Sequence, residues 1–62
     1  MKSHTFEVQV GKDRGSYTTR YSFVSTSLHN SRAWLYYSSI NIGRGYKKRL
    51  VRDGKVIARQ LS

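Results

Sequence analysis

The chain has 62 residues, no cysteine and no proline, and its 12 lysines and arginines face three acids, giving a formal net charge of +9. A chain of this length forms one small domain, so residues 1–62 are taken as a single basic domain without an interdomain substrate cleft. Without cysteine there is no disulfide and no thiolate metal site. Because a large positive excess attracts polyanions, we expect a nucleic acid, DNA or RNA, or an acidic protein surface as partner.

Targeting signals are missing from the pattern of apolar residues. No apolar run reaches the roughly 18 residues of a membrane span, and the first ten residues lack the apolar core of a secretory signal. We therefore expect a cytoplasmic protein without a membrane partner, associated with the nucleoid if it binds DNA.

An alternation of apolar and polar residues marks the first strand, which we predict over His4–Val10. Phe6, Val8 and Val10 share one face and should be buried, because side chains alternate across a strand. The two glycines of residues 11–15 then predict a turn.

The second strand is predicted over Ser16–Thr26, where tyrosine, phenylalanine, threonine and valine suit a pleated surface. Strict alternation places four residues on one face: Tyr17, Thr19, Tyr21 and Phe23. Two strands joined by a short glycine-bearing loop predict an antiparallel hairpin.

Residues 28–42 fit two structures. Three residues can cap the start of a helix, namely Ser27, Asn30 and Ser31, and Gly43 stands where a helix would end in the left-handed conformation. Helical spacing places one set on a common face: Ala33, Tyr36, Tyr37 and Ile40. Strand spacing instead alternates another set: Trp34, Tyr36, Ile40 and Ile42. We favour the helix, because it covers apolar surface that a bare sheet leaves wet.

A second hairpin is predicted around Asp53–Gly54, since this dipeptide suits a two-residue type I′ turn. The turn predicts five cross-strand pairs: Arg52–Lys55, Val51–Val56, Leu50–Ile57, Arg49–Ala58 and Lys48–Arg59. The first and the last pair place like charges opposite each other, which is destabilising. The two apolar pairs point to opposite faces, so one should enter the core and the other should stay partly exposed.

The predicted fold is α+β, in the order β-β-α-β-β, with one helix packed on a face of a small antiparallel sheet. The alternative, if residues 28–42 form a strand, is an all-β five-stranded small barrel.

The second hairpin also supplies the candidate site. Its cations are Arg44, Lys47, Lys48, Arg49, Arg52, Lys55 and Arg59. Cations at strand spacing can follow a phosphate backbone, and a two-stranded ribbon fits the major groove of DNA. Arg20 and the loop at Lys12–Arg14 would extend this surface, and Tyr46 is the tyrosine best placed to stack on a base. A charged edge that blocks aggregation is the alternative, but it does not require a single sign of charge.

The sequence offers few residues suited to catalysis. The acids are Glu7, Asp13 and Asp53, and neither His4 nor His29 has metal-ligand spacing. We expect no enzymatic activity, no catalytic residue, no metal and no cofactor.

The stretch His4–Val8, HTFEV, followed by a strand–helix–strand pattern, resembles the small host-takeover proteins of T7-like phages. That group includes an inhibitor of bacterial RNA polymerase, which is not strongly basic, so this sequence departs from it in charge. The resemblance implies a phage origin and a host enzyme as target, and it identifies no functional residue.

Two functions are therefore expected. The first is a small nucleic-acid-binding module that contacts phosphates through the cationic hairpin with weak sequence specificity. The second is an inhibitor or adaptor that binds an acidic surface of a host enzyme such as RNA polymerase or a nuclease. We expect a monomer or a dimer paired through an edge strand.

Overall fold

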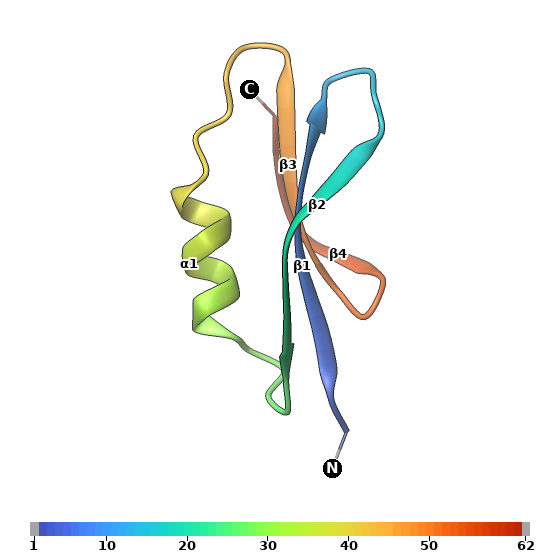
Figure 1. The fold of residues 1–62 in the computed structure, drawn as a ribbon, viewed down its shortest axis with the longest axis vertical. Helices are drawn as coiled ribbons and strands as arrows, with labels where there is room; N and C mark the ends of the chain where they lie inside the picture. Colours follow the sequence, from blue (N-terminus) through green and yellow to red (C-terminus); the bar gives the residue numbers. More distant parts are fainter. Residues whose placement is uncertain (1, 62) are drawn as a thin grey trace.

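The computed structural model describes residues 2–61, which form one open sheet and one helix (Figure 1). The elements are β1 (His4–Lys12), β2 (Tyr17–Ser25), α1 (Ser31–Ser39), β3 (Tyr46–Arg52) and β4 (Lys55–Leu61). The four strands are antiparallel in the order β2-β1-β3-β4, and α1 lies against one face. The predicted β-β-α-β-β fold is confirmed, and the barrel alternative is wrong because residues 31–39 are helical and the sheet does not close.

The core lies between α1 and the two central strands. Phe6 and Val8 of β1, Leu50 of β3 and Ala33 of α1 are fully buried, and Tyr37 of α1 packs among them. The predicted buried face of the first strand is therefore confirmed at Phe6 and Val8. Because so few side chains form this core, a change at any one of them removes a large share of the apolar burial.

The two ends of α1 are capped by different means. At the start, the Asn30 side-chain oxygen accepts hydrogen bonds from the backbone N–H groups of Arg32 and Ala33, at 3.0 and 3.3 Å. The prediction of a left-handed cap at Gly43 is wrong, since the helix ends at Ser39 and Ile40 is already extended. Instead, the side chain of Lys48 caps the C-terminal end of the helix.

A bulge in β2 overturns the strict alternation predicted there. Tyr21 pairs with Val8 and Thr19 pairs with Gln9, so Arg20 is an extra residue in the strand. Tyr21 consequently faces α1, whereas Thr19 lies on the opposite side of the sheet, where its hydroxyl reaches the carboxylate of the β1 residue Glu7.

The aromatic residues of β2 separate in the same way. Tyr21 and Phe23 pack on Tyr36 of α1, with ring centroids 4.7 and 5.2 Å apart. Tyr17 lies on the other face, where Arg49 of β3 covers its ring. The four residues predicted to share a face are thus divided between two.

The second hairpin follows its predicted register for two pairs and then shifts. Arg52–Lys55 and Val51–Val56 are confirmed, but Leu50 pairs with Ala58, Arg49 with Arg59 and Lys48 with Gln60. The extra residue is Ile57, which packs against the core together with Ala58. The shift also moves Arg59 away from the helix side, where the predicted register placed it across from buried Lys48.

The turn of this hairpin holds the start of β1. Asp53 and Gly54 both have positive φ, 51° and 83°, as a type I′ turn requires. One Asp53 carboxylate oxygen lies 2.6 Å from His4 Nδ1, and the other accepts from the Thr5 backbone N–H at 2.9 Å. The hydrogen bond from His4, and next that from Thr5, hold the pKa of Asp53 below its ordinary value of 3.8.

We expect Asp53→Asn to be less stable than the wild type at neutral pH, with a difference that shrinks in acid. A lowered carboxyl pKa means that its stabilisation is complete above 3.8 and is lost as pH falls through the folded-state pKa. Thermal unfolding followed by circular dichroism from about pH 7 to about pH 2 measures this. The control is Asp13→Asn, since the Asp13 carboxylate has no hydrogen bond within residues 2–61. A difference that stays constant with pH would contradict the assignment.

Candidate nucleic-acid interface

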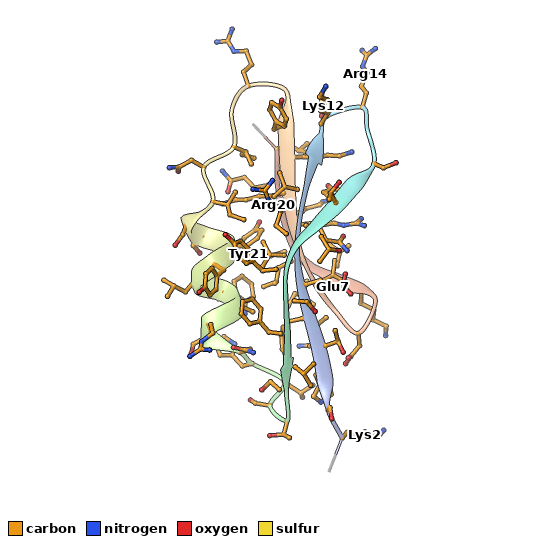
Figure 2. All side chains as sticks on the ribbon, in the orientation of Figure 1. Lys2, Glu7, Lys12, Arg14, Arg20 and Tyr21 are labelled. Carbon is orange, nitrogen blue, oxygen red and sulfur yellow. The ribbon has the colours of Figure 1, made fainter. Side chains whose placement is uncertain are left out.

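The face of the sheet turned away from α1 is uncovered, and we call it the open face. Its polar and charged side chains come from all four strands: Tyr17 and Thr19 of β2, Glu7 and Gln9 of β1, Lys47 and Arg49 of β3, and Arg59 of β4. Figure 2 shows Glu7 on this side of the sheet and Tyr21 on the helix side. The interstrand register brings these residues together from segments far apart in the sequence.

Tyr17 holds two cations of β3 in place. The Arg49 guanidinium lies 3.8 Å from the centre of the Tyr17 ring, and Lys47 Nζ lies 4.6 Å from it. An aromatic ring attracts cations over its face through its quadrupole. The ring therefore keeps two positive charges next to each other on the open face.

A chain of hydrogen bonds fixes Arg49 from its other side. Arg49 Nε donates to Gln9 Oε1 at 2.6 Å, and the Gln9 amide donates to Glu7 Oε1 at 2.8 Å. Thr19 donates to the same Glu7 oxygen at 3.1 Å. Nε is the guanidinium donor used within residues 2–61, so the two Nη groups of Arg49 remain for an outside acceptor. Two parallel N–H donors match a phosphate or a carboxylate.

Arg59 adds a third cation directly across from Arg49. Like charges facing each other across a sheet cost roughly 0.2–1 kcal/mol. No acid separates this pair in the register, since Val51 and Lys47 occupy the neighbouring open-face positions of β3. An anion bound between the two guanidinium groups would remove that repulsion.

Lys48, predicted as a phosphate contact, is instead buried on the helix side. Its Nζ donates to the carbonyl oxygens of Tyr37 and Ile40, at 2.7 and 2.8 Å, and lies 4.7 Å from the centre of the Tyr37 ring. It therefore caps the C-terminal end of α1. Burial lowers the pKa of Lys48 from its ordinary value. Burial also raises the pKa of Tyr37, with a smaller contribution from Tyr17.

The remaining predicted residues do not join the open face. Arg52 and its partner Lys55 lie at the turn end of the second hairpin, and Arg52 donates to the Leu28 carbonyl at 3.1 Å. Arg44 is exposed in the loop before β3. Arg20 and Tyr46 line a groove on the helix side. The single cationic hairpin surface that was predicted is thus divided, and Lys47, Arg49 and Arg59 are the members that the open face brings together.

Sequence reasoning missed the residues that organise these three cations. Glu7 and Gln9 are polar residues that alternate with Phe6, Val8 and Val10 in the first strand, but nothing in their spacing indicated that β3 would pair with β1 and place Arg49 beside Gln9. Tyr17 was assigned to the face of Tyr21. The true position of Tyr17 follows from the bulge at Arg20, and no residue type in that stretch indicates a bulge.

Within residues 2–61 no helix is long and apolar enough to cross a membrane. The same residues contain no group of three or more histidine, aspartate or glutamate side chains arranged to hold a metal ion. No family model, curated protein or solved structure matches this chain.

Proposed function

We propose that this protein binds nucleic acid through the open face, with Lys47, Arg49 and Arg59 contacting phosphates. The observation that carries the proposal is the ordered arrangement of these cations: Tyr17 and Gln9 hold Arg49, while its Nη groups meet no acceptor among residues 2–61. Preorganised donors lose little conformational freedom on binding, so a smaller entropy cost offsets the interaction energy. The net charge of +9 adds a long-range attraction for any polyanion.

Phosphate contacts of this kind carry little sequence information. Gln9 is the open-face amide closest to the cations, and both ends of its side chain are already engaged by Arg49 and Glu7. Binding should therefore be mainly electrostatic, with weak preference among sequences.

The alternative function, an inhibitor or adaptor on an acidic protein surface, needs apolar contact area beside the cations. On the second hairpin Val51 is buried, and exposed apolar area beside the cations comes from two side chains of β4, Val56 and Leu61. The nucleic-acid proposal requires no such area and is therefore preferred.

The test is the salt dependence of binding, measured by fluorescence anisotropy with labelled nucleic acid between about 50 and 200 mM salt. If the wild type neutralises about six phosphates, log K falls against log[salt] with a slope near −5. Arg49→Gln with Arg59→Gln should flatten the slope by about 2, because each lost phosphate contact on a duplex removes about 0.9.

The matched control is Lys2→Gln with Arg32→Gln, which removes the same charge from the chain start and from α1. It should leave the slope close to that of the wild type. An equal loss in both double variants would show that net charge alone drives binding, and the open face would then not be the site. If neither the variants nor the wild type bind nucleic acid near physiological salt, an acidic protein surface becomes the partner to test.

A further inference from the structure

The helix covers only part of the sheet face on which it packs, and one end of that face is uncovered. With nine residues, α1 is about 14 Å long, whereas the molecule measures 40 Å along its longest axis. Figure 1 shows that the C-terminal end of α1 is the end nearer to the β1–β2 turn. Residues of that turn and of the strands beside it line a groove of about 380 Å³. The lining side chains are Val10, Lys12, Ser16, Thr18, Arg20 and Tyr46. This groove lies on the face of the sheet opposite to the open face.

The groove combines the groups that recognise a phosphate with an aromatic ring. Lys12 and Arg20 supply two exposed cations, and Ser16 and Thr18 supply hydroxyls. Tyr46 is 42% exposed, which leaves much of its ring accessible. Aromatic rings beside cations form stacking sites for nucleic-acid bases.

A smaller hollow of about 200 Å³ adjoins this groove, and Val10 and Tyr46 line both. Its other walls are Asn41, Ile42 and Gly43, which are uncharged. The chemistry on the two sides of this shared wall differs, with cations in the groove and an apolar surface with one amide in the hollow. A nucleotide has the same division, since its phosphate is charged and its base is flat and largely apolar.

A cationic path joins the groove to the open face around this end of the molecule. The β1–β2 turn and the loop before β3 are tied together, because the Asp13 N–H donates to the Gly45 carbonyl at 2.7 Å. Lys47 of the open face donates to the Asp13 carbonyl at 3.1 Å. Exposed Arg14 and Arg44 lie on these two loops, and Figure 2 shows Arg14 at the tip.

The two extents of the molecule across its long axis are 20 and 15 Å, so both faces lie within reach of one flexible strand. Duplex DNA has a persistence length of about 150 bp and cannot turn around so thin an object. A single strand can, and its unpaired bases are free to stack.

We propose that the groove binds one nucleotide of a single strand that passes from the open face around this end, so that the protein prefers single-stranded nucleic acid to duplex. The proposal rests on the proposed function and names its substrate class. In this arrangement Lys12 and Arg20 contact a phosphate, and Tyr46 stacks on a base.

Anisotropy with a labelled single strand of about 16 nucleotides, and with the duplex of the same sequence, tests this proposal. The wild type should bind the single strand more tightly than the duplex. Tyr46→Leu should weaken single-strand binding about tenfold and change duplex binding less than about twofold, since stacking contributes to the first alone. Tyr46→Phe keeps the ring and should bind like the wild type. Tyr36→Leu removes a tyrosine of similar exposure, 39%, outside the groove and should have no effect on binding.

The outcomes separate the groove from the open face. If Arg49→Gln with Arg59→Gln weakens binding while Tyr46→Leu changes nothing, the open face stands and the groove proposal is overturned. If Tyr46→Leu weakens single strand and duplex equally, the strand preference is overturned. A titration with adenosine monophosphate gives a third arm: saturation as tight as that of the strand would make the groove a free-nucleotide site and overturn the strand path. If no nucleic acid binds the wild type, both proposals fail.

Discussion

Lys48→Glu is expected to unfold the domain, whereas Arg49→Glu, at the next position, should leave it folded and weaken its binding to nucleic acid. The two side chains point to opposite faces of β3. Lys48 donates to two carbonyl oxygens at the end of α1, so a glutamate there would bury a carboxylate against acceptors. Arg49 lies on the open face across from Arg59, where a glutamate would face an opposite charge.

The sizes of the effects decide the outcome. An uncompensated buried charge costs about 3–5 kcal/mol. A chain of 62 residues has a total stability of about 3–9 kcal/mol, at about 0.05–0.15 kcal/mol per residue. Lys48→Met keeps the apolar stem but leaves the helix carbonyls without a donor, at a cost of about 1–3 kcal/mol. We therefore expect stability to decrease from wild type to Lys48→Met to Lys48→Glu.

Urea unfolding followed by circular dichroism measures this order, and anisotropy with nucleic acid measures binding by the folded variants. A well-folded Lys48→Met should bind nucleic acid like the wild type, because Lys48 does not reach the open face. A folded Lys48→Met that loses binding would instead make Lys48 a phosphate contact.

The fold follows from local signals that agree with one another. Alternation placed Phe6 and Val8 in the core, the Asp53–Gly54 turn set the start of the second hairpin, and Asn30 was among the predicted N-caps. These signals act over two to four residues, a range in which backbone geometry determines which side chains share a face. They were therefore sufficient for the order and type of the elements.

The site depended on features that local spacing does not contain. One extra residue in a strand transfers every later side chain to the other face. The bulge at Arg20 separated Tyr17 from Tyr21, and the bulge at Ile57 moved Arg59 beside Arg49. The second bulge is a tertiary feature, because Ile57 and Ala58 both pack against the core.

Both proposed sites depend on the turn end of the first hairpin, where Gly11 lies. Gly11 pairs with Tyr17 at the end of the first hairpin, and a Cβ built there would lie 2.5 Å from the Ser16 carbonyl oxygen. It would also lie 3.2 Å from Tyr17 Cα, so backbone rather than a flexible side chain must move. Tyr17 holds the open-face cations, while Lys12 on the other side of Gly11 lines the groove.

Gly11→Ala is therefore expected to weaken single-strand and duplex binding together, by at least the loss seen in Arg49→Gln with Arg59→Gln. Overpacking of this kind costs about 1–3 kcal/mol of stability, which leaves much of the domain folded at low temperature. The control is Gly15→Ala in the same turn, where the added Cβ would meet Lys12 Cβ at 3.4 Å, an ordinary contact. That variant should stay within about 0.5 kcal/mol of the wild type and keep its affinity. Urea unfolding and anisotropy on both variants measure the two effects. A Gly11→Ala protein that is destabilised but binds both ligands normally would show that neither site depends on the turn, because the cations would then be ordered by β3 and β4 alone.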